Sequence, residues 1–264
     1  MQKDSTLGTI IVAGVLCIFC SVMVSTSAVS LKPLQEQNKK LDVKKNLLLS
    51  AGLLENKSAS KEEIERAFSV VETKIVDLST GQYNTEMNPD NYDQMSAASD
   101  PKLNTKIPSE KDYASIKKRE RFSKVFFIKE GETVKQIILP MYGKGLWSTM
   151  YGFLVLSTDT TTVEGIGFYQ HGETPGLGGE IENAQWQASW KGKRVYDESF
   201  NPILSVIKGS VTDNTANKEY KIDGLSGATL TCNGVTGMIK YWMGEEGFGP
   251  FLKKYRTKNT VSSL

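Results

Sequence analysis

An apolar run near the N-terminus constrains this chain more than any other feature. Residues 7–31 contain no charged side chain, and the run is bounded by Asp4 and Lys32. A helix needs about 20 mostly apolar residues to cross a bilayer, so this run is long enough to span one. A cleaved signal peptide is the alternative, with small residues at 25–28 for cleavage, but the run exceeds the apolar region of such peptides. Either interpretation exports the rest of the chain, and we expect a retained anchor.

The charges that flank this run leave its orientation open. Five lysines lie within residues 32–45, whereas only Lys3 precedes the run. The positive-inside rule alone would therefore keep the C-terminal body in the cytoplasm. A long domain can cross the membrane regardless of local charge, so composition does not decide the side. Because the run holds no ionisable Asp, Glu, Lys or Arg, this chain alone offers no path for an ion.

The rest of the composition is that of an ordinary globular protein, with 39% apolar and 23% charged residues. A net charge of +2 without a basic stripe argues against nucleic acid as a partner. Cys17 and Cys20 lie in the apolar run, which leaves Cys232 and His171 as the remaining cysteine and the single histidine. This excludes a disulfide framework and a Cys/His metal cluster. Any redox chemistry must therefore come from an organic cofactor.

Residue patterns predict helices at both ends of the body and strands between them. We expect helical residues at 33–54, a capping box at 60–63 that opens a helix to about residue 71, a short strand at 74–78 and a long loop at 84–115. Strands follow at 124–128 with 133–139 and at 151–156 with 163–169, each pair a hairpin. A helix at 181–190, strands at 202–207 and 219–223, and a helix at 230–243 complete the chain. This order predicts an α+β domain with one mainly antiparallel sheet and flanking helices.

The sharpest motif is Asp-Gly-Leu-Ser-Gly-Ala-Thr at residues 223–229, between a predicted strand and a predicted helix. Glycines let a backbone approach a ligand closely, and the start of a helix points unpaired N–H groups that favour a phosphate. Thr229 would present its hydroxyl at that point. The alternative is a glycine-containing turn in which Ser226 or Thr229 only caps the helix.

This motif is identical to the recognition motif of proteins that a bacterial flavin transferase modifies, in which the final Thr is joined to FMN by a phosphoester bond. The whole chain resembles the C subunit of the sodium-translocating NADH:quinone oxidoreductase. Residues 145–152, 171–178 and 226–231 match that family as well. We match the apolar run and roughly residues 120–255 to this family, and we leave residues 55–115 unmatched.

The resemblance implies a single-pass protein of the bacterial inner membrane with covalent FMN on Thr229. Its partners would be the membrane, the flavin transferase and the other subunits of the respiratory complex. We expect a cytoplasmic N-terminus at 1–6, a transmembrane helix at 7–31, a helical and loop region at 32–120 packing on the domain, and an extracytoplasmic FMN-binding domain at 121–264.

The resemblance also implies which residues surround the flavin. Besides Thr229, they are Ser226, Gly227, Ala228, Thr231, Glu173, Thr174, Gly176, Leu177, Leu146 and Trp147. Each has a structural alternative, since glycine-rich turns commonly bind nothing and a lone Trp is commonly part of a core. For Thr231, a hydrogen bond to the phosphate and a helix cap remain equally open. His171 and Lys144 are left outside the predicted site.

The predicted function is electron transfer as a subunit of the reductase, with no complete active site in this chain alone. No G-x-G-x-x-G fingerprint is present, so NADH would be oxidised on another subunit. One alternative is the G subunit of the related ferredoxin-linked complex, although residues 145–152 favour the quinone oxidoreductase. The others are an anchored module without flavin and a serine hydrolase with Ser226 as nucleophile. The hydrolase would need His171, which precedes the serine, whereas in a nucleophile elbow the histidine follows it.

Overall fold

The computed structural model describes residues 5–55 and 58–262, and the chain divides into two units, residues 1–43 and 44–264. The first unit is the greater part of α1 (Thr6–Ser50), with Pro33 inside the helix. Its apolar part is long enough to cross a membrane, and Ile10, Ile18 and Phe19 there are exposed. The helical segments expected at 7–31 and 33–54 are thus one helix that ends at Ser50. Residues 1–4 of the expected N-terminal segment lie outside the described residues.

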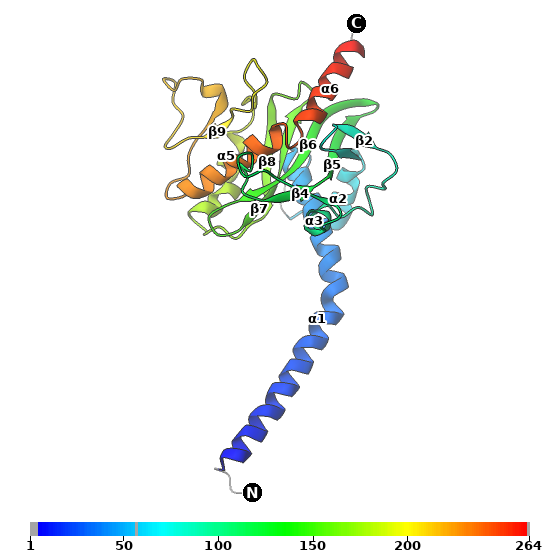
Figure 1. Cartoon of the computed structure of the whole chain (residues 1–264), viewed down its shortest axis with the longest axis vertical. Helices are drawn as coiled ribbons and strands as arrows, with labels where there is room; N and C mark the ends of the chain where they lie inside the picture. Colours follow the sequence, from blue (N-terminus) through cyan, green and yellow to red (C-terminus); the bar gives the residue numbers. More distant parts are fainter. Residues whose placement is uncertain (1–4, 56–57, 263–264) are drawn as a thin grey trace. The chain divides into compact units, whose positions relative to one another are not determined.

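The second unit is built on a six-stranded antiparallel sheet with the strand order β2-β1-β5-β6-β7-β8 (Figure 1). The strands are β1 (Val71–Asp77), β2 (Gln82–Asn84), β5 (Phe122–Glu130), β6 (Thr133–Lys144), β7 (Thr149–Ser157) and β8 (Val163–Gln170). Both predicted hairpins and the antiparallel sheet are confirmed. Because β1 and β2 belong to this sheet, the sheet domain extends well before the expected boundary at residue 121.

Both faces of the central strands are covered. In β7, Phe153, Leu154, Val155 and Leu156 are all buried, whereas a sheet with one solvated face would alternate. Leu154 and Leu156 belong to the main core cluster with α5 (Thr229–Met243) and α6 (Gly249–Ser262). The alternate residues face the last turns of α1, from residue 44 onward, where Leu47 and Leu48 are buried. The unit therefore consists of helices on both faces of a sheet.

Several predicted boundaries are wrong, and capping groups explain most of the differences. α2 (Lys61–Phe68) has the expected capping box, with Ser60 and Glu63 bonded to each other's backbone N–H, but it ends before residue 71. Asn183 divides the helix expected at 181–190 into η1 (Gly178–Glu182) and α4 (Ala184–Ala188). Its side chain accepts hydrogen bonds from the first-turn N–H groups of α4, so a new helix begins there.

Short elements replace other expected segments. The expected loop at 84–115 contains α3 (Gln94–Ser99), capped by Asp93, and β3 (Asn104–Lys106), which pairs with β4 (Lys118–Glu120). Elements of three to six residues are too short to show a periodic pattern. In place of the strands expected at 202–207 and 219–223, the structure has the shorter β9 (Ser205–Val206) and β10 (Lys221–Ile222), which form a separate parallel pair. The short helix η2 (Lys218–Tyr220) directly precedes β10.

α5 packs closely against β6, and this contact positions the candidate site. The indole N–H of Trp242 donates to the carbonyl oxygen of Tyr142 over 2.6 Å. Val235, Met238 and Ile239, predicted to lie on one stripe of this helix with Trp242, are all buried. In Figure 1, α5 lies beside the strands, between the β9 segment and α6. The helix is thus packed against the sheet along this stripe, while Thr229 and Leu230 at its start remain exposed.

Candidate functional site

The motif at residues 223–229 forms the connection between β10 and α5, as predicted. The carboxylate of Asp223 accepts a hydrogen bond from the N–H of Val211 over 2.7 Å, and its carbonyl oxygen accepts one from the indole of Trp186 over 2.8 Å. Gly227 has a φ of +71°, and a Cβ there would lie 2.7 Å from Leu177 Cδ2. Glycine is required at this position both for its backbone conformation and for its contact with Leu177.

The first turn of α5 presents an open helix terminus. The residue that precedes it, Ala228, is buried, and among the described residues no side chain caps the helix. The backbone N–H groups of a first turn have no partner within the helix and carry a partial positive charge. Thr229 is exposed at this point, as are Ser226 and Gly227. The alternative in which Ser226 or Thr229 caps the helix is therefore wrong.

A buried carboxylate ties this terminus to two other segments. Glu173 lies in the loop after β8 and is 4% exposed. It accepts hydrogen bonds from the backbone N–H groups of Leu146, Trp147 and Ser148 at 3.1, 3.0 and 3.3 Å. It also accepts one from the hydroxyl of Thr231 at 2.5 Å. The turn between β6 and β7, the loop after β8 and the start of α5 therefore converge on this carboxylate.

The hydrogen bonds of Glu173 settle two further points. Burial alone would raise the pKa of this carboxyl, but the bonds from Thr231 and the three backbone N–H groups outweigh it and hold the pKa below its ordinary value. The sequence leaves two roles open for Thr231, a bond to the phosphate and a helix cap. Its one hydroxyl proton is donated to Glu173, so Thr231 has no proton to donate to a phosphate. It does not cap the helix either, because the N-cap residue is Ala228.

Large apolar side chains of the three converging segments are exposed to solvent. Leu146 is 43%, Trp147 66%, Leu177 44% and Leu230 59% exposed. The core alternative for Trp147 is therefore wrong. Leu230 was not among the predicted site residues, although its position directly after Thr229 could have indicated it. Single exposed apolar residues are ordinary, but a group of them from three segments marks a binding surface.

Other residues of the loop after β8 shape it. The carbonyl oxygen of Thr174 accepts hydrogen bonds from the N–H groups of Leu177 and Gly179, and Gly176 turns the chain with a φ of +76°. The side chain of Thr174 is exposed. His171 lies outside the predicted set and serves the loop itself. Its Nδ1 accepts from the N–H of Glu173, and its Nε2 is 2.8 Å from Glu182. Because Nδ1 is bonded within this loop and Nε2 lies beside Glu182, the histidine does not support a hydrolase with Ser226.

Comparison with known proteins identifies the family. The FMN-binding domain family matches residues 145–244, which contain all the predicted site residues. The C subunit of the Na+-translocating NADH-quinone reductase of Pseudomonas aeruginosa is 44% identical over 255 residues, which cover 97% of this chain and 98% of that protein. The C subunit of Haemophilus ducreyi is 44% identical over 257 residues, with 97% and 96% covered. This chain belongs to the family of C subunits of the Na+-translocating NADH-quinone reductase.

Solved structures of this family agree with the fold. The crystal structure of Shewanella oneidensis NqrC, 30% identical, matches with a TM-score of 0.76 over 84% of this chain and 99% of that chain. The structure of the C subunit from Parabacteroides distasonis, 26% identical, matches with a TM-score of 0.64 over 84% and 96%. The family therefore accounts for the antiparallel sheet with its flanking helices, and it favours the C subunit of the reductase over the related G subunit.

The residues at the start of α5 fit FMN by their chemistry. The uncapped first turn provides N–H donors for a phosphate, and the exposed leucines and Trp147 provide apolar surface for an aromatic ring. Gly145 and Gly178 bring backbone close to Glu173, since a Cβ on either would lie within 3.0 Å of its carboxylate oxygens. A donor-rich terminus beside an apolar surface is the combination that a flavin mononucleotide requires.

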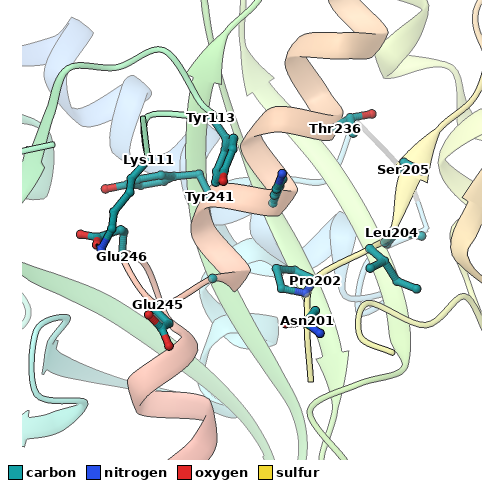
Figure 2. A pocket seen from close by; sticks show the side chains of 13 residues that line it. Lys111, Tyr113, Asn201, Pro202, Leu204, Ser205, Thr236, Tyr241, Glu245 and Glu246 are labelled. Carbon is teal, nitrogen blue, oxygen red and sulfur yellow. The ribbon is translucent and has the colours of Figure 1, made fainter. Parts of the chain in front are cut away.

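A pocket elsewhere on the domain fits FMN less well than the start of α5 does. A pocket of about 610 Å³ lies along the C-terminal half of α5 (Figure 2). Both of its lysines are already engaged, since Lys111 pairs with Glu246 at 2.6 Å and Lys240 lies over the ring of Tyr113 at 3.8 Å. The described lining includes none of the residues predicted to surround the flavin. The phosphate of FMN would find no uncapped helix terminus there.

Proposed function

We propose that this chain is the FMN-carrying electron-transfer subunit of a Na+-translocating NADH-quinone reductase, with FMN joined to Thr229 by a phosphoester bond. The observation that carries the proposal is the exposed Thr229 at an uncapped helix terminus, where three converging segments expose apolar side chains. Membership of the C-subunit family supports it, because the relatives bear the name of that complex.

The chain's own residues then bind, orient and shield the cofactor. The first-turn N–H groups of α5 hold the phosphate, while Leu146, Trp147 and Leu177 line the ring. FMN supplies the reversible uptake of electrons when bound. The assignment of Ser226, Gly227, Ala228, Thr174 and Gly176 to the same site follows from their place in the two loops. NADH is oxidised elsewhere in the complex, because this sequence carries no dinucleotide fingerprint.

The attachment is tested by replacing the proposed acceptor. Thr229→Ala, expressed together with the flavin transferase, should give folded protein without covalent flavin. Mass spectrometry of the peptide that contains residue 229 in the wild type should show the added mass of FMN. Thr257→Ala is the matched control, since Thr257 is an exposed threonine of α6 whose hydroxyl bonds only to the carbonyl of Lys253. Covalent flavin on Thr229→Ala would assign the attachment to another hydroxyl.

We also propose that α1 anchors the chain in the bacterial inner membrane with residues 44–264 outside the cytoplasm. The support is the long exposed apolar helix and the family, while the lysines after the span argue the other way. Alkaline phosphatase fused to the C-terminus should be active, and a green fluorescent protein fused there should be dark. The reverse pattern would place the electron path on the cytoplasmic side.

A further inference from the structure

The carboxylate of Glu173 has no lone pair left for a ligand. Its Oε1 accepts from the N–H groups of Trp147 and Ser148, and its Oε2 accepts from the N–H of Leu146 and the hydroxyl of Thr231. A carboxylate offers about four acceptor positions, two on each oxygen, so these four donors fill it. Glu173 was predicted to contact the cofactor, and the geometry gives its side chain a different task.

Those bonds fix the turn at residues 145–148, which carries two of the side chains proposed to line the flavin. Three successive N–H groups of the turn after β6 point inward at one carboxylate, while the side chains of Leu146 and Trp147 in the same turn remain exposed. The fourth donor, Thr231, lies two residues after Thr229 on α5. Glu173 is therefore the only described side chain bonded to both the turn and the start of α5.

The charge of this carboxylate has no cationic partner among the described residues. Its donors are neutral, and none of the ion pairs found in residues 5–55 and 58–262 includes Glu173. A buried charge is weakly screened, so it acts on neighbouring groups more strongly than a surface charge does. A negative charge beside a flavin opposes the addition of an electron.

We propose that Glu173 is a positioning residue that fixes the turn at residues 145–148 against the start of α5 and, through its uncompensated negative charge, lowers the reduction potential of the flavin. The effect on the reduction potential rests on the proposed function, because it requires a bound flavin. The positioning of the turn does not require a flavin. The two roles separate in different variants.

Four variants of the full-length chain distinguish these roles. Glu173→Gln removes the charge and turns one oxygen into an N–H₂ group, which cannot accept from the turn. Thr231→Val keeps the charge but removes one of the four donors at nearly constant shape. Thr231→Ser keeps that donor. Glu182→Gln is the matched control, because Glu182 is a half-exposed carboxylate of the segment that follows the same loop and pairs with His171 rather than with the turn.

Two measurements then decide the proposal. In the flavinylated protein, redox titration should show an upward shift of the FMN midpoint potential for Glu173→Gln, with Glu182→Gln and Thr231→Ser at the wild-type value. In flavin-free protein carrying Thr229→Ala, hydrogen exchange at the amides of residues 146–148 should be roughly tenfold faster or more for Glu173→Gln. Thr231→Val should accelerate that exchange less and leave the potential closer to the wild-type value.

The proposal is overturned by two results. An unchanged potential in Glu173→Gln, or an equal shift in Glu182→Gln, would remove the electrostatic role. Unchanged exchange at residues 146–148 in both Glu173→Gln and Thr231→Val would remove the positioning role. Because the exchange arm uses protein without flavin, it decides the positioning role even if the attachment at Thr229 is disproved.

Discussion

At the scale of one residue, Glu120 shows how burial changes the pKa of a side chain. It is fully buried, and the hydroxyl of Tyr142 donates to it over 2.7 Å. Arg119 beside it is 3% exposed and donates to the carbonyl oxygen of Glu120 over 2.8 Å. Burial raises the pKa of Glu120 to about 7, although the hydrogen bond from Tyr142 opposes that shift. The folded protein therefore favours the protonated carboxyl.

This pKa predicts a contribution to stability that depends on pH. A carboxyl with a raised folded pKa binds its proton more tightly in the native state, so its contribution is fully present below the ordinary pKa of 4.5 and is lost as pH rises through about 7. The free energy of unfolding of the wild type relative to Glu120→Gln should therefore fall between pH 5 and pH 8. The decrease should be on the order of 3 kcal/mol at most, since one pKa unit corresponds to about 1.4 kcal/mol.

Denaturant unfolding of both proteins at several pH values measures this difference. Glu130→Gln is the control, because the side chain of Glu130 is exposed on the strand end and pairs only with Lys135. A constant difference between wild type and Glu120→Gln from pH 5 to pH 8 would show that Glu120 stays ionised in the folded protein.

At the scale of an element, α5 contains residues of low helix propensity that allow close packing. It contains Gly234 and Gly237, each of which costs about 1 kcal/mol relative to alanine in a helix interior. A Cβ on Gly234 would collide with the carbonyl oxygen of Lys144, and one on Gly237 with that of Tyr113. The helix therefore approaches the end of β6 backbone to backbone, and this approach places Thr231 within reach of Glu173.

Gly234→Ala should destabilise the protein even though alanine is the better helix former. The collision with the backbone of Lys144 forces the helix away from β6, and such overpacking costs about 1–3 kcal/mol. Asn233→Ala, on an exposed position of the same helix, should be neutral or slightly stabilising. Thermal unfolding followed by circular dichroism compares the two. A Gly234→Ala variant as stable as the wild type would mean that the helix can shift without loss of packing.

At the scale of the whole molecule, α1 contributes to both units. Its residues up to 43 belong to the first unit, while Leu47 and Leu48 are buried in the second. The side chain of Ser50 occupies the space that a Cβ on Gly167 of β8 would need. The end of the helix is therefore part of the sheet domain's core.

Two truncations test this division. A chain that starts at residue 44 should be soluble without detergent and should unfold as cooperatively as the full chain. A chain that starts at residue 52 should be much less stable, because it loses two buried leucines, and replacing one such leucine by alanine costs about 2–5 kcal/mol. Unfolding in urea measures both. Equal stability of the two fragments would show that Leu47 and Leu48 are dispensable to the domain.

Strong local patterns were enough to predict much of this protein. The apolar run at residues 7–31, the two hairpins and the amphipathic stripe of α5 all appear in the structure, because each depends on residues close together in the sequence. The motif at residues 223–229 and the two loops that meet it were likewise identified before their geometry was known. β3 was missed because three residues are too short to show a periodic pattern. The split at Asn183 was missed because a capping side chain rather than periodicity determines it.

Only the tertiary structure decided which polar groups are buried and what they bind. Residues 117–121 consist entirely of charged side chains and are typical of an exposed segment, yet Arg119 and Glu120 lie in the core. Nothing near Glu173 in the sequence indicates that its carboxylate joins the turn after β6 to Thr231, 58 residues further along the chain. Such bonds form between segments that only the packed sheet and α5 bring together. The sequence by itself predicted which segments form the candidate site, and long-range packing determined what the carboxylate of Glu173 binds.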